Sequence, residues 1–487
     1  MRYSAPELAL QTTLLGLAIA IILALVAALV GPLLIDWGSH RALFEAEASR
    51  LIGVNVRVAG AIEARLLPSP QLTLHDIAIG AGRDTIRARA LGVEVALGPL
   101  MRGEWRAAEM HLVGPQVSLR LDTSGRVRAP NLAVAFKPDE LSVDRLSIEG
   151  GNVTLTDEAS GASLSLSRLR FNGEARSLIG PLRGAGAFAI GEQLYPYRIA
   201  AGRLSDEGSF KLHVNVEPAD HPLSIETDGT LAFAAGEPHF EGTLSLARSV
   251  GIGARGNDKP QTLTQPWRVS GKVKATGQSA LMENAEFQYG SDEQGLKLTG
   301  VTEFKFGTRP RFNGVLSGRQ IDLDRAISSA GGTRQTPAEV LRKLAELGAA
   351  AFRPALPIQL GVGIDRVTLG GNNIENLRGD VSSSTGGWNL DRLEFRAPGA
   401  TQVRLSGRLA VEPDGVAFAG PAEIEVSDPR TLTAWLSGRN ETSPGELRLL
   451  NLRGEVVLAV VLRRRVVGAR RRVEPETVLR HRLDDLL

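Results

Sequence analysis

The sequence predicts an all-β protein that follows one N-terminal membrane helix. Short runs in which apolar and polar residues alternate recur along most of the chain, and each run is bounded by Gly, Pro, Asn, Asp or Ser, which favour turns. Gly supplies 54 of the 487 residues, whereas aromatic residues make up only 5%. Both values favour many short strands and tight turns, roughly 25 strands in all.

Composition and charge exclude several classes of function. The chain has 56 Lys and Arg against 54 Asp and Glu, a formal charge of +2, and no Cys. A balance so near zero gives no electrostatic case for binding nucleic acid over the whole surface. The missing Cys excludes disulfides, thiolate zinc sites and cysteine nucleophiles.

The N-terminal apolar stretch predicts a membrane anchor in residues 1–35. Thr12 to Ile35 contains no charged residue, and a helix of about 22 residues spans roughly 33 Å, which matches a bilayer core of about 30 Å. A cleaved secretory signal is the alternative, but its apolar region is usually about 7–15 residues. Arg2 precedes the stretch and Asp36 follows it, which favours an N-terminus inside and the bulk of the chain outside.

A short helix and then a long series of strands follow the anchor. Ser39 to Leu51 predicts the helix, with Ser39 as its N-cap and Gly53 as its stop. After Gly53 the apolar period changes from 3.6 to 2, which indicates half-buried strands over 36–327 and again over 351–455. In three of the early strands the apolar residues of one parity are Val54, Val56, Val58, Val93, Val95, Leu97, Val117, Leu119 and Leu121.

Residues 328–350 predict a linker and one short helix between the two β-rich segments. Thr336 as the cap, Pro337 in the first turn and Glu339 three residues after the cap form a helix-start pattern. The 11 residues Val143 to Val153 are echoed by Ile364 to Ile374. The echo indicates two copies of one building unit, although any two Gly- and Asn-rich strand turns resemble each other.

The sequence contains no motif that predicts catalysis, a cofactor or a metal ion. A G-x-G-x-x-G pattern occurs at Gly251, Gly253 and Gly256, but no helix starts there, as a dinucleotide site requires. The seven His residues lack paired ligand spacing, and the adjacent carboxylates, such as Asp157 and Glu158, lie in turn-like stretches. We therefore expect a protein that is not an enzyme; an envelope hydrolase with a dispersed site is the enzyme alternative.

Several segments occur in an order that resembles a known family. They are Ile35-Asp36-Trp37, the helix end Ala48 to Gly53, the strand Val54 to Gly60, Leu66 to Pro70, and the alternating Leu72 to Ile77. They resemble the N-terminal signature of the AsmA family of bacterial envelope proteins. The resemblance covers about the first 155 residues well, and the strand-rich remainder more loosely.

The resemblance implies an inner-membrane anchor with the bulk of the chain in the periplasm. It also implies an elongated, curled antiparallel sheet that forms an open apolar groove, as in bridge-like lipid transfer proteins, and a role in outer-membrane assembly or lipid homeostasis. The nine residues named above are then candidates to line the groove, with phospholipid or lipopolysaccharide acyl chains as the guests. Alternation alone is equally typical of closed β-sandwich domains, and the alternative function is an envelope scaffold that binds outer-membrane assembly proteins.

The C-terminal tail, 456–487, departs from the expected pattern. Val456 to Leu462 is continuously apolar, and eight Arg residues follow within 20 positions: Arg463, Arg464, Arg465, Arg470, Arg471, Arg472, Arg480 and Arg482. A basic patch that attracts anionic lipid headgroups is one interpretation. A native ending replaced through a shifted reading frame or an early stop is the other.

Overall fold

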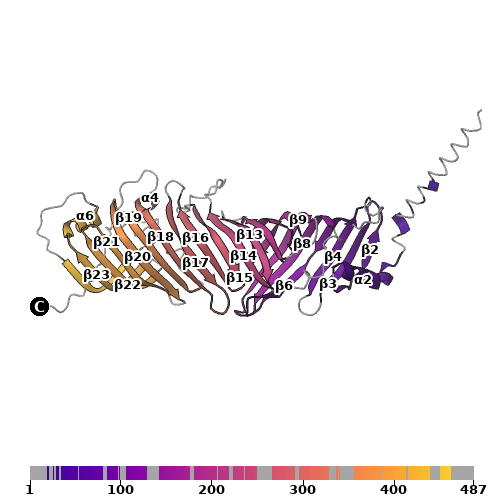
Figure 1. The fold of residues 1–487 in the computed structure, drawn as a ribbon, viewed down its shortest axis with the longest axis horizontal. Coiled ribbons are helices and arrows are strands. Elements are labelled where there is room, and N and C mark those ends of the chain that lie inside the picture. The colour runs from indigo at the N-terminus through magenta and orange to yellow at the C-terminus, as the bar shows by residue number, and fades with distance from the viewer. Residues whose placement is uncertain are drawn as a thin grey trace, which may run out of the picture. The chain divides into compact units, whose positions relative to one another are not determined.

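The computed structural model describes most of the chain after the N-terminal segment. The described residues are 19–20, 23, 26, 29–31, 35–52, 54–80, 85–96, 98, 106–128, 142–175, 180–205, 207–218, 223–234, 236–248, 266–290, 295–327, 336–337, 339–340, 356–384, 387–412, 415–438 and 450–461. They form two compact units, divided between Phe240 and Glu241 within strand β14 (Glu237–Arg248). Strands dominate both units (Figure 1), so the predicted all-β class is confirmed.

The first unit contains two short helical segments and a series of strands. The helical segments are η1 (Trp37–His40), a 3₁₀ turn, and α2 (Arg41–Ile52). The strands are β1 (Val56–Val58), β2 (Ile62–Arg65), β3 (Gln71–Ile79), β4 (Ile86–Val95), β5 (Arg106–Val113), β6 (Gln116–Leu121), β7 (Val127–Arg128), β8 (Ser142–Asp157), β9 (Ser163–Ala175), β10 (Leu182–Ile190), β11 (Gln193–Ala201), β12 (Ser209–Val216) and β13 (Leu223–Ala234).

The second unit has the same character. Its described helices include α4 (Leu323–Ile327) and α6 (Pro429–Ser437), and Pro337, Glu339 and Val340 are also helical. Its strands after β14 are β15 (Trp267–Thr276), β16 (Ser279–Tyr289), β17 (Leu296–Lys305), β18 (Arg311–Asp322), β19 (Ile358–Leu369), β20 (Asn372–Ser384), β21 (Gly387–Ala397), β22 (Thr401–Glu412), β23 (Gly415–Val426) and β24 (Leu450–Val461).

The sheet in each unit is mixed, which corrects the expectation of a purely antiparallel sheet. Most neighbouring strands pair antiparallel, as short connections require. In the first unit, however, β8 pairs parallel with β5 and then with β6, and in the second unit β19 pairs parallel with β18. A parallel pair needs a longer connection that returns the chain to the same end of the sheet. Residues 129–141 precede β8 and residues 323–357 precede β19.

The echoed sequences have one topological property in common. Val143 to Val153 lies in β8, and Ile364 to Ile374 begins in β19, so each copy belongs to the strand that re-enters its sheet parallel. Their local structures differ. Gly150 (φ +64°) lies inside the continuous strand β8, whereas Gly370 and Gly371 (φ +60° and +75°) form the hairpin turn between β19 and β20.

Helix α2 covers the apolar side of the first strands. Phe44 and Ala48 pack on a cluster formed by the buried residues Val56, Val58, Ile62, Leu74 and Ile77. The helix also bonds to the edge of β1, because Val56 N–H donates to Ser49 Oγ (2.9 Å) and Val58 N–H to Glu45 Oε1 (2.7 Å). These hydrogen bonds pair backbone N–H groups at the edge of β1 that would otherwise bond to water or to another chain.

The predicted start of this helix is wrong in detail. The helical turn begins at Trp37, and its cap is Asp36, whose Oδ1 accepts from Gly38 N–H at 3.0 Å. The Ser39 hydroxyl instead donates to the Asp36 carbonyl oxygen at 2.7 Å. An extra 3₁₀ turn therefore precedes α2, which the apolar period of the helix does not reveal.

A second apolar cluster belongs to the second unit. Its members are Ile321, Val340, Ile364, Val367, Leu369, Ile374, Ala397 and Trp435. Thr336 and Glu339 form the predicted capping box: Thr336 N–H donates to Glu339 Oε2 (2.9 Å) and Glu339 N–H to Thr336 Oγ1 (3.4 Å). Val340, from the segment expected to be a linker, is completely buried in this cluster.

Other expectations fall partly or wholly outside the described residues. None of the described helices is long and apolar enough to cross a membrane, and much of Thr12 to Ile35 is not described. Strand β24 continues through position 456 to Val461, paired with β23, so regular pairing extends past the expected break. Leu97, the G-x-G-x-x-G segment and the Arg-rich residues from 463 onward lie outside the description.

Candidate functional site

The most extensive feature of the first unit is a row of large apolar residues on one face of its sheet. Residues that are register partners on neighbouring strands lie on the same face. Following the partners from β2 to β13 across ten strands gives the first apolar row: Ile62, Leu74, Leu91, Leu112, Ile148, Phe171, Gly186, Tyr197, Val216 and Ile225.

A second row runs beside the first, two residues along each strand. The second apolar row is Ala64, Leu72, Val93, Met110, Leu146, Gly173, Gly184, Ile199, Val214 and Thr227. The residues between the two rows point to the opposite face. They are Glu63, Thr73, Gly92, His111, Ser147, Asn172, Ala185, Arg198, Asn215 and Glu226, without one large apolar side chain.

The two apolar rows are buried at one end and only half-buried over most of their length. Ile62 and Leu74 are 6% and 4% exposed, because α2 packs over them. Leu91, Leu112 and Ile148, next in the first row, are half-buried, and Leu91 still packs against the cluster beneath α2. An apolar sheet face normally packs against a second layer. Among the described residues of the first unit, helix α2 is the only such cover.

The middle of the rows is lined by aromatic rings that lie close to the backbone. A Cβ atom on Gly184 would lie 2.5 Å from the ring of Phe171, and one on Gly173 would lie 2.7 Å from it. The Phe171 ring therefore occupies the space above both glycines, and it is 6% exposed. Next to it, the Tyr197 hydroxyl donates to the Arg170 carbonyl oxygen at 3.1 Å. Burial raises the pKa of Tyr197 to about 12.

The structure separates the sequence-predicted lining residues into groups. Val56 and Val58 are 2% exposed beneath α2, and Val54 precedes β1 and is half-buried. Val93 belongs to the second apolar row, and Val95 ends β4, half-buried. The three predicted residues of β6 are half-buried, and they lie in register with Val153, Leu155 and Asp157 of β8; these three are Val117, Leu119 and Leu121.

The sequence-based set missed most of the rows. Leu112, Ile148, Phe171, Tyr197 and Val216 were not among the predicted lining residues. Alternation reveals which residues of one strand share a face, but it does not reveal which residue of the next strand lies opposite. The register between neighbouring strands brings both rows into line.

The described residues contain no cluster suited to metal-ion chemistry. No group of three or more His, Asp or Glu side chains that could hold a metal ion occurs among them. Of the adjacent carboxylates, Asp157 accepts from Ala159 N–H (3.0 Å) and from Ser160 Oγ, and Glu158 pairs with Arg120 at 3.5 Å. Both carboxylates thus stabilise a turn between β8 and β9.

The fold and the two apolar rows define a class: a β-sheet protein with a long apolar face that a single short helix covers at one end. Residues 9–177 match the model of the AsmA family. The resemblance is thereby confirmed over these residues. The comparisons with curated proteins and with solved structures gave no match.

Proposed function

We propose that this protein shelters lipid acyl chains along the two apolar rows and so supports lipid homeostasis and outer-membrane assembly. The observation that carries the proposal is the pair of aligned, half-buried apolar rows across ten strands. Burying apolar surface stabilises a bound chain by about 25 cal/mol per Å². Because that term depends on area and not on direction, an acyl chain could move along the rows with little positional preference.

The proposal includes a position in the cell. The uncharged stretch Thr12 to Ile35 would anchor the chain in the inner membrane, with the β-rich units in the periplasm. Supporting this, the apolar residues described within that stretch are helical and exposed; Leu23 is 63% and Leu29 60% exposed. In this position the apolar rows would meet phospholipid or lipopolysaccharide acyl chains, and the protein would act by binding and without catalysis.

Site-specific photocrosslinking in native membranes tests the proposal. A photoreactive amino acid at Leu112 lies on the first apolar row, whereas one at the adjacent His111 lies on the opposite face of the same strand. We expect lipid adducts at position 112 and none at 111, with mass spectrometry identifying the lipid. Protein adducts alone at position 112 would favour the envelope scaffold. Equal lipid labelling at both positions would mean general membrane contact and would contradict the proposal.

A further inference from the structure

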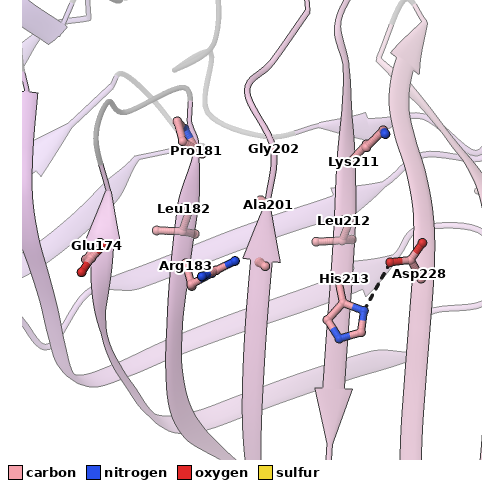
Figure 2. A pocket seen from close by; sticks show the side chains of 11 residues that line it. Glu174, Pro181, Leu182, Arg183, Ala201, Gly202, Lys211, Leu212, His213 and Asp228 are labelled. Atoms are coloured by element: carbon pink, nitrogen blue, oxygen red, sulfur yellow. Dashed lines mark ion pairs between the residues drawn. The ribbon is translucent and has the colours of Figure 1, made fainter.

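The polar face of the first unit has a depression with an ordered arrangement of charge. Five register partners on β9 to β13 cross it in the order Glu174, Arg183, Ala200, His213 and Asp228. The two basic side chains thus flank a small residue, and the two carboxylates lie outside them. Figure 2 shows these side chains around the depression, whose volume is about 490 Å³.

Small residues at the end of strand β11 lie between basic residues of the two neighbouring strands. Ala200 of β11 and Gly202, the residue after the end of that strand, line the depression without long side chains. Arg183 comes from β10 and Lys211 from β12 (Figure 2). Strands two apart are separated by about 10 Å. The extended side chains of Arg183 and Lys211 can therefore reach the same small group from the two sides of β11.

Two of the three basic groups are available for a ligand. His213 Nδ1 lies 3.3 Å from Asp228 Oδ2, so this carboxylate is already engaged. Neither Arg183 nor Lys211 has an ion-pair partner in the part of the chain that the structure describes. Glu174 is the register partner of Arg183, but no ion pair joins the two side chains.

We propose that this depression binds a phosphate group. A guanidinium donates two parallel hydrogen bonds and an ammonium acts as a point charge, and both suit phosphate oxygens. A tetrahedral phosphate presents oxygens in several directions, so it can accept from Arg183 and Lys211 at once, whereas a carboxylate has two oxygens in one plane. The volume lies in the usual range for small-molecule sites, roughly 300–1,000 Å³, which leaves room for the molecule that carries the phosphate.

The test uses the full chain in detergent micelles and inorganic phosphate as the probe, measured by isothermal titration calorimetry near 0.15 M salt, where the Debye length is about 8 Å. We expect saturable binding that the double variant Arg183→Gln/Lys211→Gln weakens at least about tenfold, because it removes both charged hydrogen-bond donors. The matched control is Arg57→Gln/Lys297→Gln, which removes the same charge from exposed positions outside the depression. It should bind phosphate as the unmodified chain does.

Two results would overturn the site. The first is that the unmodified chain shows no saturable phosphate binding. The second is that both double variants lose phosphate affinity equally, which would mean that only the overall charge matters. Competition identifies the source: displacement by phosphatidic acid in mixed micelles would assign a lipid headgroup, and displacement by glycerol 3-phosphate but not by phosphatidic acid would assign a soluble phosphate. Because the depression lies on the face opposite the apolar rows, failure here leaves the acyl-chain proposal standing.

Discussion

At the scale of single residues, glycines permit aromatic rings to line a sheet that is otherwise aliphatic. Gly173 and Gly184 leave the space that the Phe171 ring fills, and any Cβ there would collide with the ring. The hydroxyl of Tyr197, the neighbouring ring, is anchored to Arg170. The low content of aromatic residues in the sequence thus conceals a local concentration of rings on β9 to β11, where Phe188 and Tyr195 also stack at 5.4 Å.

Replacing Tyr197 with Phe should lower the free energy of unfolding of the first unit. It should also make that free energy depend less on pH in the alkaline range. The lost hydrogen bond should cost about 0.5–1.5 kcal/mol. Because burial raises the pKa of Tyr197 from 10.0 to about 12, the neutral phenol stabilises the folded state below pH 10, and that contribution is lost as the pH rises toward 12. Urea unfolding at a series of alkaline pH values should show the difference between wild type and Tyr197→Phe shrinking over this interval.

The control for that experiment is Tyr195→Phe, which leaves the Tyr197 to Arg170 hydrogen bond in place. The control should retain the alkaline loss of stability seen in the unmodified chain. If Tyr197→Phe shows the same alkaline loss as the unmodified chain, then the Tyr197 phenol is not the group responsible.

At the scale of elements, short helices determine where an apolar sheet face is closed. Helix α6 begins with Asp428, whose Oδ1 accepts from Arg430 and Thr431 N–H, and ends at Gly438 in the left-handed region (φ +66°). These caps fix a helix of nine residues that would be marginal in isolation. It places Trp435 in the second apolar cluster, where Trp435 Nε1 donates to the Leu369 carbonyl oxygen at 2.8 Å.

Removing the Trp435 side chain should open this cluster. We expect Trp435→Ala to lower the free energy of unfolding of the second unit by about 3–5 kcal/mol, because it leaves a cavity and an unpaired carbonyl group. Hydrogen exchange at the hairpin between Leu369 and Asn372 should accelerate strongly. The adjacent Leu436 is 50% exposed, so Leu436→Ala should change stability by no more than about 0.5 kcal/mol. Similar effects of the two variants would refute this role of Trp435.

At the scale of the whole molecule, each unit is a chain of sequential strand pairings with one parallel re-entry. This architecture lets successive strands extend an apolar row without a long-range partner strand, as the register from β8 to β13 illustrates. In the first unit the rows are covered at α2, and in the second unit a closed cluster includes residues of α6 and Val340. The proposed acyl-chain site is therefore the half-buried part of the first unit.

The proposed topology predicts the behaviour of reporter fusions. Alkaline phosphatase joined after Gly125, in the turn that follows β6, should be active, because the anchor would place this turn in the periplasm. The same reporter joined upstream of Thr12 should be inactive. Activity of a cytoplasmic reporter after Gly125 would contradict the proposed orientation.

The sequence predicted the strands and the apolar parity within them, but only part of the site. The alternation at Leu72 and Leu74, or at Val117 and Leu119, identifies a strand because side chains of a strand point to alternate faces. Helix α6 was missed because it is only nine residues long, although Asp428 before Pro429 and Gly438 after Ser437 are helix start and stop signals. The rows were missed as rows, because Leu112 and Ile148 are 36 positions apart and only their parallel pairing makes them neighbours.

The amino-acid sequence alone predicted local properties: the all-β class, the turn positions, the capping box at Thr336 and the family signature. All of these depend on residues close together in the chain. The tertiary structure decided which strands run parallel, how the apolar residues align into rows and where helices cover them. Those properties depend on contacts between distant segments, and an alternating strand is compatible with either a covered or an uncovered face. The same physical reason applies to the proposed phosphate site. Arg183 and Lys211 line the same depression only because β10, β11 and β12 pair in this register.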